Sequence, residues 1–159
     1  MTALPAACVV DASVAIKLFL IEDYMAEVQA YFLRAGDDVE LHAPDLLPIE
    51  CSNILWKQVQ RTGYAPAQAQ RDLADLLSLN EVHWVSTGTL LPQALEIAML
   101  HAITSYDACY VALADRLQMP LLTADNRLAN KLVSSRHHIL TLDAIFTPAV
   151  GEKSGDQTR

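Results

Sequence analysis

The chain contains 159 residues, of which 52% are hydrophobic and 19% are charged, and its formal net charge is −8. This length predicts one domain with a substantial core, and the composition excludes a disordered or low-complexity chain. The negative charge argues against broad electrostatic attraction to nucleic acid or to an anionic membrane, although it leaves room for a local basic groove. The high apolar share indicates a surface that is buried against a partner or a second copy.

Short apolar runs alternate along the chain with longer stretches of helical pattern. The runs predicted as strands cover residues 6–10, 39–43, 82–85, 119–123 and 139–142. The stretches predicted as helices cover residues 13–20, 23–33, 48–63, 67–79, 90–101, 105–117 and 126–133. This alternation predicts an α/β fold, with helices covering both faces of a mainly parallel sheet.

The pattern predicts one domain over residues 1–147 and a polar, frayed tail over residues 148–159. The N-terminus lacks the basic segment of a signal peptide, and no apolar run approaches the ~18 residues of a membrane span. The cysteines are odd in number and form no CxxC pair, which argues against a disulfide framework or a zinc knuckle; they are Cys8, Cys51 and Cys109. We therefore expect a cytoplasmic protein without a membrane partner.

Two aspartates stand at the ends of predicted strands. Asp11 follows the run Val9-Val10, and Asp125 follows the run that ends at Thr123. In a parallel sheet, ligands bind beyond the carboxyl ends of the strands, so these positions are candidates for a functional site. Each aspartate also precedes a predicted helix, and a simple helix-capping role is an equally good interpretation of either one alone.

Two further carboxylates lie at the start of predicted helices. Asp107 fits a capping box with Thr104, yet the helix behind it is apolar all round and therefore predicted to be buried. Glu50 shares a helical stripe with apolar residues such as Leu47 and Ile54. A carboxylate on an apolar stripe is costly unless it is paired or bound to a metal; the alternative is a glutamate that extends to solvent along a helix–helix seam.

If these four carboxylates converge, a cation must offset their repulsion. An all-oxygen donor set suits Mg²⁺ or Mn²⁺, and such a cluster is a common device for attack of water on a phosphodiester. Ser13 and Thr123 are placed to orient a carboxylate or a water, although ordinary helix-start roles explain them too. Lys17 lies one helical turn beyond Ser13, where it could reach a phosphate or simply face solvent.

Four blocks of this sequence resemble the motifs of PIN-domain proteins, in the family's order and approximate spacing. They begin with the segment Val9-Val10-Asp11-Ala12-Ser13-Val14-Ala15-Ile16-Lys17 and lie within residues 9–142. The other three blocks are residues 43–56 around Glu50, residues 104–114 around Asp107 and residues 121–128 around Asp125. Each block carries one acidic residue, and four such blocks in order form a specific signal.

The resemblance implies a three-layer α/β/α fold and an Mg²⁺- or Mn²⁺-dependent ribonuclease. It assigns the acidic positions to Asp11, Glu50, Asp107 and Asp125, with Asp11, Asp107 and Asp125 as metal ligands, and the small polar positions to Ser13 and Thr123. Many small members of the family are toxins of VapBC-type toxin–antitoxin modules, which dimerise and are inhibited by a small antitoxin. Some members carry a further acidic residue after the fourth; Asn126 and Arg127 stand there in this chain, which argues against a tightly held second metal.

The leading hypothesis is therefore an endoribonuclease, with RNA held by Arg127, Lys131 and Lys17. A phosphatase or phosphotransfer domain is a second hypothesis, but such phosphatases carry Asp-x-Asp after the first strand, and here the triplet is Asp11-Ala12-Ser13. A third is a non-catalytic PIN-fold module that binds nucleic acid or protein. The presence of all four acidic residues favours the ribonuclease over the non-catalytic module. An assay for metal-dependent RNA cleavage separates these two hypotheses.

Overall fold

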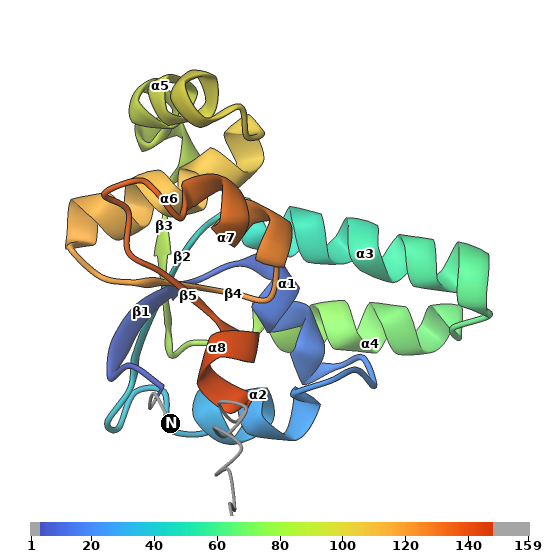
Figure 1. Cartoon of the computed structure of the whole chain (residues 1–159). Helices are drawn as coiled ribbons and strands as arrows, with labels where there is room; N and C mark the ends of the chain where they lie inside the picture. Colours follow the sequence, from blue (N-terminus) through green and yellow to red (C-terminus); the bar gives the residue numbers. More distant parts are fainter. Residues whose placement is uncertain (1–3, 148–159) are drawn as a thin grey trace, which may run out of the picture.

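The computed structural model describes residues 4–147, which form a central parallel sheet covered by helices on both faces (Figure 1). The five strands are ordered β3-β2-β1-β4-β5, and every pair of neighbours is parallel. They are β1 (Ala7–Val10), β2 (Glu40–Pro44), β3 (Val82–Val85), β4 (Leu121–Thr123) and β5 (Ile139–Thr141). This architecture confirms the predicted α/β/α fold with a parallel sheet.

The helices that link the strands divide between the two faces of the sheet. They are α1 (Ala12–Ala15), η1 (Ile16–Leu18), α2 (Met25–Phe32), α3 (Leu47–Thr62), α4 (Pro66–Leu77), η2 (Thr87–Thr89), α5 (Leu91–His101), α6 (Ser105–Leu117), α7 (Asn126–Leu132) and α8 (Leu142–Phe146). Figure 1 shows α6 and α7 above the sheet, α2 and α8 below it, and α3 and α4 extending together to one side. Because β1 and β4 are neighbours whose chains continue to opposite sides, the strand order switches between them.

Helix α6 is the central element of the core. The sequence predicts a helix buried on all sides, and the structure confirms it: residues 108–114 are all buried. This helix contacts β1, β2 and β4 on one side and α5 on the other. Its amino end begins at Thr104, whose hydroxyl accepts a hydrogen bond from the Asp107 backbone N–H at 3.0 Å. The core therefore fixes where the first turn of α6 meets the sheet.

The structure differs from the sequence prediction at two short helices. The predicted helix over residues 13–20 is split into one turn of α-helix, α1, followed by the 3₁₀ segment η1. A final helix, α8, follows β5 directly where no helix is predicted. Thr141 caps it by accepting a hydrogen bond from the Ala144 N–H at 3.1 Å, and its residues Leu142 and Ile145 are buried. Both elements are too short for a helical period to show in sequence.

Three further expectations concern the cysteines, membrane-spanning helices and the C-terminal tail. Cys8, Cys51 and Cys109 are all buried free thiols, as expected for a chain without a disulfide framework. Within residues 4–147, no single helix is long and apolar enough to cross a bilayer; α5 and α6 pass that test only as a pair, with a bend of 113° between them. The predicted frayed tail over residues 148–159 lies outside the described part of the chain.

Candidate metal centre and active site

The four predicted carboxylates line one cavity of about 230 Å³ at the carboxyl edge of the sheet. Asp11 follows β1 and Asp125 follows β4, so the two aspartates come from adjacent strands at the switch in strand order. Glu50 reaches the cavity from the first turn of α3, and Asp107 from the first turn of α6. The convergence expected from the sequence is therefore present.

Asp11 is the buried member of the group. Its carboxylate accepts hydrogen bonds from the hydroxyls of Ser13 at 2.6 Å and Thr123 at 2.5 Å, and from the Val14 N–H at 3.1 Å. Burial raises its pKa from 3.8 to about 6, although the two hydroxyls and the N–H oppose that rise, and the charge of Asp107 adds to it. Asp11 does cap α1, as its simplest interpretation predicts, but the cap leaves its charge facing other carboxylates.

Ser13 and Thr123 hold the ends of β1 and β4 together. Each hydroxyl donates to Asp11 and also accepts a backbone N–H from the segment after β4. Ser13 Oγ accepts from Ala124 N at 2.8 Å, and Thr123 Oγ1 accepts from Asp125 N at 2.9 Å. These bonds fix the carboxylate of Asp11 relative to the backbone at Asp125. The predicted orienting role of both residues fits this geometry.

Glu50 lies half-buried against Tyr110, whose hydroxyl donates to Glu50 Oε2. Burial raises the pKa of Glu50; the Tyr110 hydroxyl lowers it, and the negative charges of Asp107 and Asp11 raise it further. Burial also raises the pKa of the Tyr110 hydroxyl, and the charge of Glu50 adds to that rise. The Tyr110 hydroxyl therefore keeps its proton and donates it in a hydrogen bond that orients one oxygen of Glu50. The other oxygen of Glu50 is left free to face the cavity.

Asp107 and Asp125 each combine a cap with a place in the cavity wall. Thr104 Oγ1 accepts from the Asp107 N–H, which is one half of the predicted capping box, and it donates to the Asp107 carboxylate at 2.8 Å. Asp125 caps α7 by accepting from the N–H groups of Arg127 at 2.8 Å and Leu128 at 3.2 Å. In both cases the capping bonds leave acceptor capacity on the carboxylate, because each carboxylate has about four lone-pair sites.

The predicted RNA-binding cations do not all lie near the carboxylates. Arg127 and Lys131 line a second cavity of about 580 Å³, which shares Asp107 and Asp125 with the carboxylate cavity. Lys17 instead is buried and donates to Glu22 at 3.0 Å. The structure therefore places Arg127 and Lys131 beside the site and leaves Lys17 outside it.

Three residues that the sequence analysis did not single out also line the carboxylate cavity: Asn53, Lys57 and Tyr110. A helical signal for them exists in the sequence. Asn53 and Lys57 follow Glu50 by three and seven residues, and Tyr110 follows Asp107 by three, so each shares a helix face with a recognised carboxylate.

The donor set of this cavity fits a hard divalent cation. Four carboxylates face one space, and no Lys, Arg or His in residues 4–147 forms an ion pair with any of them. Lys57 lines the cavity without forming such a pair, and burial raises the pKa of Asp11 and Glu50, so a bound cation would relieve the cost of holding both charged. Oxygen donors of this kind suit Mg²⁺ or Mn²⁺.

The fold and site define a three-layer α/β/α protein with an acidic centre at the switch in its strand order, and comparison with known proteins identifies the family. A sequence model of the PIN domain matches residues 8–132, so the chain belongs to the PIN-domain family. It is 36% identical over 126 residues to a protein of Pyrobaculum aerophilum named Ribonuclease VapC3, covering 77% of this chain and 92% of the relative.

Solved structures share the fold of this chain. A crystal structure of a protein from Pyrobaculum aerophilum superposes with a TM-score of 0.65 at 25% identity, over 87% of this chain and 94% of the other. A chain of a toxin–antitoxin complex from Klebsiella pneumoniae shares the fold, with a TM-score of 0.58 at 12% identity, over 84% and 96% of the two chains.

Proposed function

We propose that this protein is a divalent-metal-dependent endoribonuclease and the toxin of a toxin–antitoxin module that acts in the cytoplasm. The observation that carries the proposal is the convergence of Asp11, Glu50, Asp107 and Asp125 on one cavity, where no cationic side chain of the described part of the chain forms an ion pair with them. Its 36% identity to a protein named a ribonuclease supports the choice of RNA as substrate. We assign this activity to one PIN-like domain over residues 1–147.

Asp11, Asp107 and Asp125 would hold the metal, directly or through water. A bound Mg²⁺ or Mn²⁺ supplies a water polarised for attack and offsets charge that develops on the phosphate. Ser13 and Thr123 hold Asp11 in one orientation, so its oxygens need no rearrangement when a cation arrives. Glu50 is a further ligand or takes the proton of the attacking water, and the Tyr110 hydroxyl holds one of its two oxygens in place.

The proposal is tested by incubating the protein with end-labelled single-stranded RNA and Mg²⁺ and measuring product lengths. Cleavage within the strand is expected, whereas DNA of the same sequence should remain intact. Intact RNA across a panel of structured and unstructured substrates would contradict the enzyme. It would favour the alternative, a PIN-fold module that binds nucleic acid or protein without cutting it, provided that RNA or protein binding is then measured.

Arg127 and Lys131 are proposed to hold the RNA backbone. Both lie on α7 beside the carboxylates, where a phosphate chain leaving the acidic centre would pass. Replacing both with alanine should weaken RNA binding similarly for all sequences. Each lost phosphate contact should reduce the slope of log affinity against log salt by roughly 0.7 for a single strand. The measurement is RNA affinity by fluorescence anisotropy over a series of salt concentrations. An unchanged slope in the double variant would mean that the RNA backbone binds elsewhere. As a control, Lys17→Ala is expected to leave the slope unaltered.

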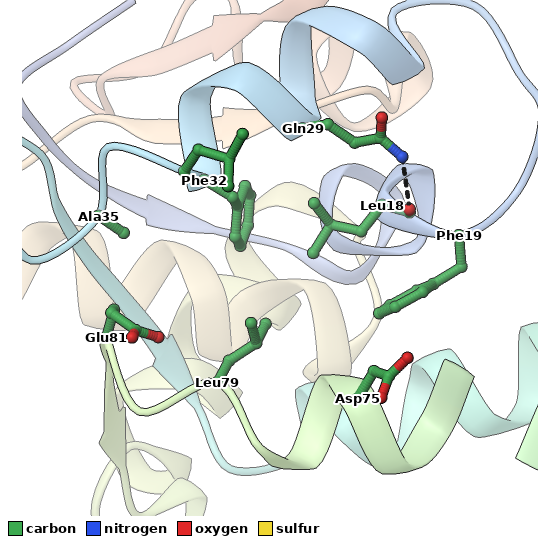
Figure 2. A pocket seen from close by; sticks show the side chains of 9 residues that line it. Leu18, Phe19, Gln29, Phe32, Ala35, Asp75, Leu79 and Glu81 are labelled. Atoms are coloured by element: carbon green, nitrogen blue, oxygen red, sulfur yellow. Dashed lines mark hydrogen bonds between the residues drawn. The ribbon is translucent and has the colours of Figure 1, made fainter. Parts of the chain in front are cut away.

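We propose that the antitoxin binds in an apolar groove that shares no lining residue with the carboxylate cavity. The groove encloses about 470 Å³ between η1, α2 and the end of α4. Figure 2 shows Leu18, Phe32 and Leu79 pointing toward one another across it, with Asp75 and Glu81 at its edge. This combination fits an apolar segment with basic flanks, which the net charge of −8 also favours.

The predicted homodimer has a candidate surface on α5. Leu91, Leu95 and Met99 follow one another at one-turn spacing and are exposed by 49%, 53% and 70%. An apolar stripe of this kind marks an interaction site more often than a solvated face. Light scattering should therefore give about 35 kDa, twice the 17.5 kDa of the chain. A 17.5 kDa species at micromolar concentration would contradict the dimer, and Leu95→Glu should produce that species if α5 is the interface.

A further inference from the structure

A cluster of two histidines and a glutamate lies on the sheet away from the carboxylate cavity. His42 of β2 and His83 of β3 are register partners on neighbouring parallel strands, and Glu40 precedes His42 by two residues. Since side chains alternate along a strand, all three point to the same face of the sheet. One ligand atom from each residue lies within 4.8 Å of the others.

This face is the one opposite α2. Cys8 of β1 contacts the Tyr31 hydroxyl of α2 at 3.3 Å, and the register partner of Cys8 in β2 is Leu41. Leu41 therefore faces α2, and its neighbours Glu40 and His42 face the other way. Because β3 is the edge strand of the sheet, this corner is incompletely covered, and Glu40 and His83 are exposed to solvent.

The three side chains are already arranged around a common point. His42 Nε2 lies 2.6 Å from Glu40 Oε1, and the rings of His42 and His83 stack with centroids 4.8 Å apart and planes inclined by 29°. The His42 side chain is only 12% exposed and is therefore fixed, whereas that of Glu40 is 51% exposed. The exposed Glu40 and His83 can move the short distance needed to share one ion with His42.

The cluster is separate from the proposed catalytic centre. Glu40 pairs with Ala7, the first residue of β1, whereas Asp11 follows the last residue of that strand. His42 pairs with Val9, two residues before Asp11, and His83 lies on the edge strand β3, beyond β2 and away from the β1–β4 switch. None of the three residues lines the carboxylate cavity. Their donors also differ, since two imidazole nitrogens and one carboxylate oxygen favour a borderline transition metal over Mg²⁺.

We propose that Glu40, His42 and His83 form a second metal site, specific for a transition-metal ion of the Zn²⁺ class. Two histidines and one carboxylate form a common zinc donor set, with water completing the coordination. A hydrogen bond between His42 and Glu40 would stabilise β2 alone and would not need His83. An ion held by all three would tie the edge strand β3 to β2, and would thereby support α3 and α4, which lie between them in the chain.

The test is a Zn²⁺ titration of the tag-free, full-length protein by calorimetry, in excess Mg²⁺ to occupy the carboxylate cavity. One Zn²⁺ per chain is expected for the wild type. His83→Gln and Glu40→Gln should each weaken Zn²⁺ binding at least about tenfold, because even losing a residue that only orients a ligand commonly costs that much. His138→Gln, a change at an exposed histidine elsewhere, should leave the affinity unchanged.

Two further variants, Asp11→Asn and His101→Gln, and a Co²⁺ absorption spectrum show which residues hold the ion. Asp11→Asn should retain Zn²⁺ binding, and Co²⁺ should give the strong visible absorption of a low-coordinate nitrogen-containing site in wild type but not in His83→Gln. His101 and His137 form another histidine pair, with Nε2 atoms 3.2 Å apart. Zinc binding that survives His83→Gln and is lost in His101→Gln would overturn the proposal, as would binding lost in Asp11→Asn or no binding at micromolar Zn²⁺.

Discussion

Asp11→Asn and Asp107→Asn are each expected to reduce RNA cleavage by roughly a thousandfold or more. Each substitution keeps the shape of the side chain and removes one negative charge from the cavity that all four carboxylates line. The cation supplies several kcal/mol of charge stabilisation in the transition state, and each ~1.4 kcal/mol that is lost costs a factor of ten in rate. The measurement is the single-turnover cleavage rate at saturating Mg²⁺.

A matched control is available at Asp72 in α4. Asp72 is buried like Asp11 and accepts hydrogen bonds from the Tyr64 hydroxyl at 2.5 Å and from Gln68 at 2.7 Å, but it lines no part of the carboxylate cavity. Asp72→Asn should therefore lower stability by about 1–2 kcal/mol and leave the cleavage rate per folded molecule unchanged. Full activity in Asp11→Asn would show that Asp11 is only a cap of α1.

The same substitution at Asp11 should make the metal-free protein more stable at neutral pH. Burial raises the pKa of Asp11 from 3.8 to about 6 in the folded state. As the pH rises from 4, the unfolded chain releases this proton first, so the folded state loses relative stability up to about pH 6 and remains penalised above it. That difference in pKa corresponds to roughly 3 kcal/mol, of which Asn should recover about 1–3 because it keeps only part of the hydrogen bonding.

Metal should reverse this penalty in the wild type and fail to do so in the variant. At a metal concentration ten times the dissociation constant, binding adds about 1.4 kcal/mol, which raises the melting temperature by very roughly 3–5 °C. The measurements are thermal melts from pH 4 to 8, in EDTA and in Mg²⁺ or Mn²⁺. Asp11→Asn should show a flatter pH profile and little metal shift. A wild type indifferent to metal, with Asp11→Asn clearly less stable in EDTA at pH 7, would mean that Asp11 is a structural carboxylate.

Much of the site is predictable from sequence because two of its carboxylates lie at the carboxyl ends of strands, and the strands are visible as apolar runs. Asp11 and Asp125 follow apolar runs that the sequence predicts as strands, and parallel pairing of β1 and β4 brings the ends of these two runs together. Glu50 and Asp107 are visible as charges at the start of apolar helices. Their convergence on the same cavity depends on how α3 and α6 pack, which the resemblance to the PIN family implies and helical periodicity alone does not.

Other parts of the site were beyond prediction because side-chain direction depends on tertiary packing. Lys17 follows Ser13 by one helical turn, but the helix tightens into η1 there and the ammonium of Lys17 turns to Glu22. Tyr110 lies inside the most apolar segment of the chain, where an aromatic residue suggests only core packing. The structure shows that its hydroxyl orients Glu50.

The histidine cluster shows the same limit at longer range. His42 and His83 are 41 positions apart, and no HxH or HExxH pattern in the sequence connects them. Only the register of β2 against β3 places the two rings side by side, and register in a buried parallel sheet is set by the packing of the whole sheet.

The most direct test of the catalytic proposal is metal removal and return on a single preparation of wild-type protein. Protein freed of metal with EDTA should leave single-stranded RNA intact, and addition of excess Mg²⁺ or Mn²⁺ should restore cleavage to the original rate. The Asp107→Asn protein, treated in parallel, should not recover. Cleavage that continues at the same rate in EDTA would contradict the assignment of these four carboxylates to a metal-dependent ribonuclease site.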